Sequence, residues 1–185
     1  MRNLSILITI FILASCTTIK NTTNIDARLQ ASEYNSISSQ YTTRPTFVQV
    51  DELTNGYINL TVKMDMYGSD QSAIAFGKRN ADLHIALIDK YLEWETLAQE
   101  RGDILSKKIG EANSWKNDST NIYNQYQFHS GNKSNHYLVV RSCALGTCID
   151  KPQYYDKSNA IRLKELLLKF KQGEIHAKNL DDIYK

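Results

Sequence analysis

A change of hydrophobic period along the chain most constrains the fold. Apolar and polar side chains alternate through residues 58–66, and a period of two indicates a strand with one buried face. A similar stretch, residues 46–53, precedes it across the pair Asn55 and Gly56, which favours a tight hairpin turn. A third stretch, residues 72–78, follows a polar turn. The sequence therefore predicts three consecutive antiparallel strands.

The period then becomes helical. Asn80 can cap a helix that runs to Arg101, and Gly102 suits a left-handed helix end. One side of this helix is apolar, and it carries Leu83, Leu87, Tyr91, Trp94 and Ala98. We expect this side to pack across the sheet as the main element of the core. A looser, Asn-rich connection is predicted for residues 109–120.

The second half of the chain repeats strands before a helix. Strands are predicted at residues 121–130 and 136–143, with room for a short strand before the last helix. That helix is capped by Ser158 or Asn159 and ends at Gln172. The predicted fold class is α+β: an antiparallel β-sheet of about five strands with two packed helices, in the order βββαββα.

Residues 1–15 have the order of a secretory signal. Arg2 supplies a positive charge, an apolar run occupies residues 4–13, and small residues precede Cys16. The apolar run is shorter than the roughly twenty residues that a transmembrane helix needs. We therefore expect residues 1–15 to be a signal peptide that is removed on export.

The four residues Leu13, Ala14, Ser15 and Cys16 resemble the lipobox of bacterial lipoproteins. The resemblance covers the signal only, and it implies diacylglycerol on the Cys16 sulfur, cleavage just before Cys16, and usually acylation of the new amine. Two or more acyl chains hold a protein stably at a membrane surface. Thr17 follows the cysteine rather than Asp, which the resemblance associates with sorting to the outer membrane, facing the periplasm.

The segment after the lipobox is rich in Ser, Thr, Asn and Gln. We predict that residues 16–45 contain the lipidated cysteine and a flexible tether, with a mean span on the order of 30 Å. A short helix at residues 26–34 is the alternative for part of it. A single α+β domain is then expected over residues 46–185, a length that fits one hydrophobic core.

The other two cysteines, Cys143 and Cys148, lie five positions apart around Gly146. In a reducing compartment the pair could be half of a metal site, but zinc sites usually have four ligands and the other half is missing. In an oxidising compartment a local disulfide is the default. We predict that disulfide, and we expect no metal site and no cofactor.

Two pairs of residues are candidates for binding. His129 and His136 flank a hairpin loop and are expected to stand side by side across the two strands. Tyr154 and Tyr155 lie near the predicted disulfide, and tyrosine is common where proteins contact other macromolecules. The alternative is that these tyrosines are ordinary strand residues.

No nucleophile elbow, HExxH motif or phosphate-binding glycine loop occurs in the sequence at a recognisable spacing. The net charge of +2 gives no strong field for nucleic acid, so we expect no such partner. The sequence favours a non-enzymatic, lipid-anchored binding or assembly module of the bacterial cell envelope, which includes an inhibitor or immunity protein. Its partners would be the membrane, through the N-terminal lipid, and an envelope protein. The alternative is a periplasmic hydrolase that uses His129 or His136 as a base.

Overall fold

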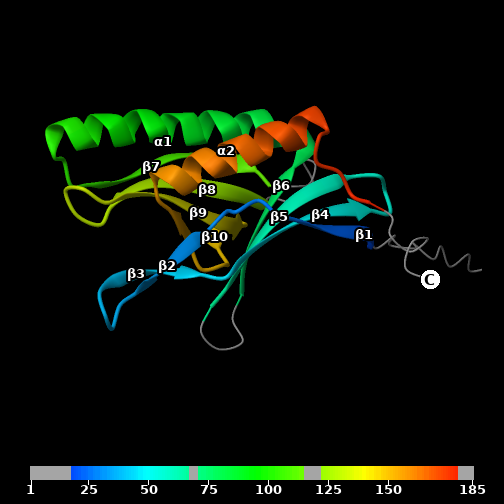
Figure 1. The fold of residues 1–185 in the computed structure, drawn as a ribbon, viewed down its shortest axis with the longest axis horizontal. Helices are drawn as coiled ribbons and strands as arrows, with labels where there is room; N and C mark the ends of the chain where they lie inside the picture. Colours follow the sequence, from blue (N-terminus) through cyan, green and yellow to red (C-terminus); the bar gives the residue numbers. More distant parts are fainter. Residues whose placement is uncertain (1–17, 67–70, 115–121, 179–185) are drawn as a thin grey trace, which may run out of the picture.

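The structure is a computed structural model that describes residues 18–66, 71–114 and 122–178. Two helices pack against two antiparallel sheets, so the predicted α+β class is confirmed (Figure 1). The prediction of about five strands in the order βββαββα was wrong, because the described part of the chain contains eleven strands. The signal peptide predicted for residues 1–15, and Cys16 itself, lie outside the described residues.

The smaller sheet has four strands in the order β1-β4-β5-β6. Its members are β1 (Ile19–Ile25), β4 (Thr46–Leu53), β5 (Ile58–Asp65) and β6 (Gln71–Gly77). The hairpin predicted around Asn55 and Gly56 is confirmed, with Gly56 at a φ of 76°. This positive φ is the conformation for which glycine is suited.

The larger sheet has seven strands in the order β3-β2-β11-β9-β8-β7, with β10 paired to β9. Its members are β2 (Ala31–Asn35), β3 (Gln40–Arg44), β7 (Ser106–Asn113), β8 (Ile122–Ser130), β9 (His136–Ala144), β10 (Thr147–Cys148) and β11 (Gln153–Tyr155). Strand β7 lies partly in the segment predicted as a loose connection. It is an edge strand with two lysines and a bulge near Gly110, features that hide a strand pattern in a sequence.

The prediction of a flexible tether over residues 16–45 was wrong for residues 19–44, which contain three strands. Residues 19–44 contain β1, β2 and β3, and each is paired: β1 with β4, β2 with β3 and with β11. The helix considered for residues 26–34 does not form, because β2 begins at Ala31. Polar side chains dominate these strands because much of their surface faces solvent.

Helix α1 (Ala81–Arg101) follows a short 3-10 turn, η1 (Lys78–Asn80), and ends at Gly102 with a φ of 67°. Asn80 makes no side-chain capping bond; its amide donates to the Asn113 carbonyl at 3.2 Å. Leu83, predicted on the buried side, is 56% exposed. The buried side is instead centred on Ile88 and Tyr91, so the helix is rotated relative to the prediction.

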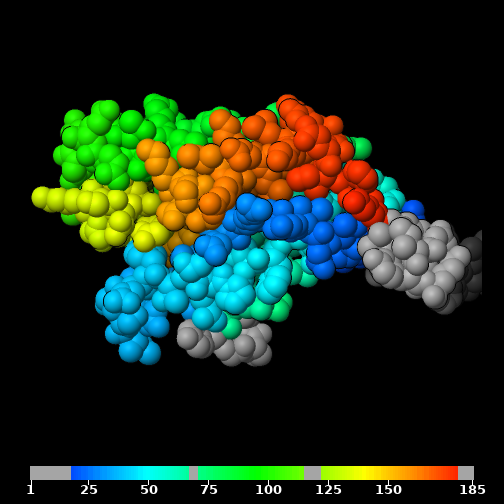
Figure 2. Space-filling model, in the orientation of Figure 1, coloured from blue at the N-terminus to red at the C-terminus, as the bar shows by residue number. Residues whose placement is uncertain are grey.

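Helix α2 (Lys157–Gln172) ends at Gln172 as predicted, and Gly173 follows it in the left-handed conformation. Its cap is Asp156, whose carboxylate accepts from the Asn159 backbone N–H at 2.8 Å, rather than Ser158 or Asn159. Both helices lie as one layer over the strands (Figures 1 and 2). Their apolar sides and the inner faces of the two sheets enclose the core.

One buried amide joins the two sheets inside this core. The Gln153 side chain on β11 donates to the carbonyls of Val62 and Ser72, at 3.1 and 3.0 Å, which belong to the smaller sheet. The Tyr155 hydroxyl donates to the same amide from within β11. Buried polar groups are tolerated when they are paired in this way, and the pairing fixes the two sheets relative to each other.

Candidate functional site

Five rings gather on the outer face of the larger sheet, the face opposite the helices. We call them the tyrosine–histidine cluster, and they are Tyr34, Tyr41, His129, Tyr137 and Tyr154. They come from β2, β3, β8, β9 and β11. They share a face because alternate residues of paired strands point to the same side of a sheet, as the pairing of His129 with Tyr137 and of Tyr34 with Tyr41 shows.

Tyr41 is the centre of the cluster. Its ring stacks on Tyr137 with centroids 4.1 Å apart and meets the edge of Tyr154 at 5.2 Å. Three steps of the strand order separate β3 from β9, so a flat sheet could not bring these rings together. The hairpin of β2 and β3 therefore curves over the outer face, and its Tyr41 ring lies against Gly131 in the β8–β9 loop.

His129 is held by hydroxyl groups on both ring nitrogens. Its Nδ1 lies 2.6 Å from the Ser106 Oγ, and its Nε2 is hydrogen-bonded to the Tyr41 hydroxyl. Burial, and then the charge of Arg141, lower the pKa of His129 below its usual value. Burial raises the pKa of Tyr41 to about 12, with smaller contributions from the neighbouring tyrosines. The Tyr41 hydroxyl and the His129 ring are therefore uncharged at neutral pH.

The two predicted binding pairs are each split between opposite faces. His129 pairs with Tyr137, and His136 pairs with Ser130, so the histidines are one residue out of the expected register. A one-residue offset turns a side chain to the other face. His136 is 4% exposed and lies inside, near the Phe128 ring. Tyr155 is fully buried as well, and these two predicted binding residues belong to the core.

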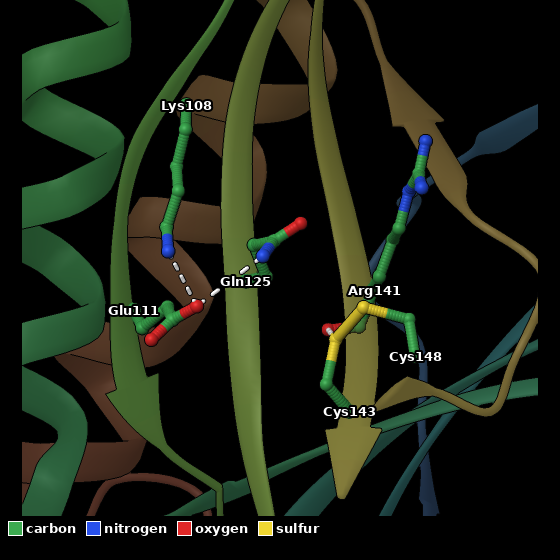
Figure 3. Close-up of polar contacts among 6 residues, drawn as sticks. All are labelled: Lys108, Glu111, Gln125, Arg141, Cys143 and Cys148. Atoms are coloured by element: carbon green, nitrogen blue, oxygen red, sulfur yellow. Dashed lines mark hydrogen bonds and ion pairs between the residues drawn. A yellow bond between two sulfur atoms is a disulfide. The ribbon is translucent and has the colours of Figure 1, made fainter. Parts of the chain in front are cut away.

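The predicted disulfide is present between Cys143 and Cys148, and it connects β9 to β10 (Figure 3). Polar side chains continue the outer face beside it. The Lys108 ammonium lies 2.6 Å from the Glu111 carboxylate, which also accepts from the Gln125 amide at 3.2 Å. These two hydrogen bonds, that from Lys108 first, lower the pKa of Glu111. The outer face of the larger sheet is thus aromatic at the tyrosine–histidine cluster and polar and charged around Lys108, Glu111 and Gln125.

Four members of the site were missed in the sequence. Tyr137 lies in the strand predicted at residues 136–143 but was not chosen as a binding residue. Tyr34 and Tyr41 lie in the segment predicted as a tether, and Ser106 lies outside every predicted strand. A tyrosine flanked by Thr and Gln, as in residues 40–43, has the β propensity of a strand. This signal was outweighed by the polar composition around it.

The chemistry open to this site is limited. The described partners of the His129 ring nitrogens are hydroxyls rather than carboxylates, so His129 lacks the acidic group that orients the base in hydrolase triads. Within residues 18–66, 71–114 and 122–178 no group of three or more His, Cys, Asp or Glu is arranged to hold a metal ion. No described helix is long and apolar enough to cross a membrane.

A groove of about 750 Å³ lies elsewhere, where the link between β1 and β2 meets the start of β4. Its lining includes Arg28, Arg44 and Arg162. Arg44 lies 3.5 Å from the Glu33 carboxylate, and Arg162 donates to the Arg28 carbonyl at 3.2 Å. The interactions of Arg44 and Arg162 are thus made within the fold, and the groove contains none of the residues predicted to bind.

Comparison with known proteins finds no matching family, no matching curated protein and no matching solved structure.

Proposed function

We propose that this protein is a lipid-anchored, non-enzymatic binding module of the bacterial cell envelope, with the outer face of the larger sheet as its contact surface. The observation that carries the proposal is the tyrosine–histidine cluster on a sheet face opposite both helices. Such a face offers rigid aromatic area beside polar groups such as Gln125 and Arg141, the composition that favours protein recognition.

The anchor in this proposal is lipid on Cys16, at the periplasmic side of the outer membrane. It is supported by the lipobox resemblance of residues 13–16 and by the apolar run before it. A disulfide between Cys143 and Cys148 fits an exported protein, because disulfides persist in oxidising compartments. The partner would be another envelope protein, and an inhibitor or immunity function is one form of such binding.

A hydrolase is the second candidate, and one observation favours it. The Ser106 Oγ lies 2.6 Å from His129, a hydrogen-bonding distance between a nucleophile and a base. Against it, Tyr41 engages the other ring nitrogen, where a triad would need a carboxylate. The binding proposal therefore accounts for more of the cluster than hydrolysis does.

Site-specific photo-crosslinking in cells tests the binding proposal. A photoreactive residue replaces Gln127, which lies on the outer face between Gln125 and His129. A matched control replaces Glu93, which is exposed on α1. We expect one discrete protein adduct from position 127 and none from position 93, with the adduct weakened by Tyr154→Ala.

Equal adducts from both positions, or none from position 127, would contradict the proposal. The hydrolase alternative is tested on the same protein after purification with its lipid. If the wild type hydrolyses simple esters and both Ser106→Ala and His129→Gln lose this activity, the result would favour the hydrolase over the binding module.

A further inference from the structure

The first described residue is fixed to the body of the domain. The Thr54 backbone N–H donates to the Thr18 carbonyl at 2.9 Å, and the Thr18 N–H donates to the Thr54 hydroxyl at 3.2 Å. Ile19 then pairs with Leu53 in the smaller sheet. The chain is therefore held from Thr18 onward, at the turn between β4 and β5.

This attachment limits how far the domain can stand from a lipid on Cys16. Thr17 is the one residue between Cys16 and Thr18. An extended chain advances at most ~3.6 Å per residue, so the attachment point of the lipid lies within about 8 Å of Thr18. The span of about 30 Å expected from a flexible tether is therefore not available to the connection between Cys16 and the domain.

The surface around Thr18 has the chemistry of a membrane interface. Ile19 is 57% exposed, and the β4–β5 turn presents the polar residues Thr54 and Asn55. The Arg79 guanidinium lies 4.8 Å above the Tyr57 ring and donates to its hydroxyl at 3.4 Å. An exposed aliphatic side chain with a tyrosine and an arginine suits the boundary between acyl chains and anionic phosphates.

At this end of the domain, Arg79 can attract anionic lipid, whereas the ion pair of Lys20 and Glu52 contributes little net charge. The Lys20 ammonium lies 3.1 Å from the Glu52 carboxylate, so this pair is close to neutral. The described partner of Arg79 is the Tyr57 ring and hydroxyl rather than a carboxylate. The Arg79 guanidinium is thus not neutralised by a described carboxylate, and anionic head groups attract such a basic residue.

We propose that the end of the domain formed by Ile19, the β4–β5 turn, Tyr57 and Arg79 rests on the phospholipid head groups, an inference that depends on the proposed lipidation of Cys16. This seating sets the orientation of the molecule. Figure 1 places β1 near one end of the long axis and the β2–β3 hairpin near the other. The end of the cluster built from Tyr34 and Tyr41 then points away from the bilayer, toward a partner.

Photo-crosslinking to lipid tests the seating. The lipidated protein is prepared with a photoreactive residue at Asn55, in the β4–β5 turn, or at Ile37, between β2 and β3 and 96% exposed. Each protein is reconstituted into vesicles of phosphatidylglycerol and phosphatidylcholine. We expect phospholipid adducts at position 55 in several-fold excess over position 37.

Two matched changes show whether the short connection and the charge cause this excess. A Gly-Ser insertion of about twenty residues before Thr18, with a mean span of about 25 Å, should abolish the excess at position 55. Arg79→Gln should lower it on anionic vesicles, whereas Arg101→Gln, at the far end of α1, should leave it unchanged. Equal yields at positions 55 and 37, or an excess that survives the insertion, would overturn the seating.

Failure of the anchor and failure of the seating remain distinguishable. If the protein isolated from cells carries no lipid, the proposed function fails. The seating is then tested on the chain from Cys16 onward, coupled through the Cys16 thiol to a maleimide lipid in the same vesicles. Position 55 must again exceed position 37 in phospholipid adducts, and equal yields in this arm would also overturn the seating.

Discussion

A single buried histidine shows how the core controls the ionisation of its members. His84 on α1 is fully buried. Its Nε2 lies 2.9 Å from the Asn113 carbonyl, which can only accept, so Nε2 carries the hydrogen. Nδ1 therefore accepts from the Tyr126 hydroxyl at 2.7 Å. The neutral ring satisfies both neighbours.

This arrangement predicts an acid-sensitive fold. Burial lowers the pKa of His84 from 6.5 to about 4, against an opposing contribution from the backbone of Asn113. The unfolded chain binds the proton near pH 6.5, whereas the folded chain binds it near pH 4. Between these values the unfolded state holds more protons, so stability falls as the pH falls, by up to about 3 kcal/mol.

Urea unfolding of residues 17–185 at pH 7 and pH 4.5 measures this effect. We expect His84→Gln to be less stable than wild type at pH 7 but to lose less further stability on acidification. His176→Gln, an exposed position near the end of the described chain, should retain the wild-type loss. An identical acid loss in the His84 variant and wild type would show that another group is responsible.

At the scale of elements, α2 carries a row of lysines that meets α1. Lys157, Lys164 and Lys171 are seven residues apart, so they share one side of the helix. Their ammonium groups lie 2.5, 2.5 and 2.6 Å from carboxylates of Glu95, Asp89 and Asp82 on the antiparallel α1. Part of the acidic side of α1 is thus an interface with α2 rather than a free surface.

The three pairs should differ in strength because only one carboxylate is buried. The Glu95 side chain is 4% exposed, whereas those of Asp89 and Asp82 are about half exposed or more. We expect Lys157→Ala to lower the free energy of unfolding by about 1–3 kcal/mol, because it leaves a buried carboxylate without its partner. Lys164→Ala and Lys171→Ala should each cost less than about 1 kcal/mol. Equal losses in the three variants, measured by urea unfolding, would contradict this ranking.

At the scale of the whole molecule, the sequence predicted elements well where burial imposes a clear period. Strand β4 was predicted with its observed bounds, and α1 with its observed end, because apolar residues recur at a strand spacing in β4 and at a helical spacing in α1. The three N-terminal strands were not predicted, because their side chains are mostly polar and only a few, such as Ala31 and Glu33, are buried. Their pairing depends on strands distant in the sequence.

The candidate site was less predictable than the fold for a related reason. Two of its five rings, His129 and Tyr154, were chosen from the sequence. Neighbouring residues of a strand face opposite sides of the sheet, so an error of one residue in the register puts a ring on the wrong side. For this reason His136 and Tyr155 face the core and are not part of the cluster. The cluster also needs the curvature of the β2–β3 hairpin over the sheet, a long-range property that local patterns do not encode.

The chemical state of Cys16 in protein isolated from membranes tests the proposed anchor most directly. We predict a mature chain that begins at Cys16 with diacylglycerol on its sulfur, detected by mass spectrometry of the N-terminal peptide. Labelled fatty acid should enter the wild type, whereas Cys16→Ser should take up no label and accumulate as an uncleaved precursor. An unmodified Cys16 in the membrane-bound wild type, or a mature chain that begins at another residue, would contradict the proposed lipid anchor.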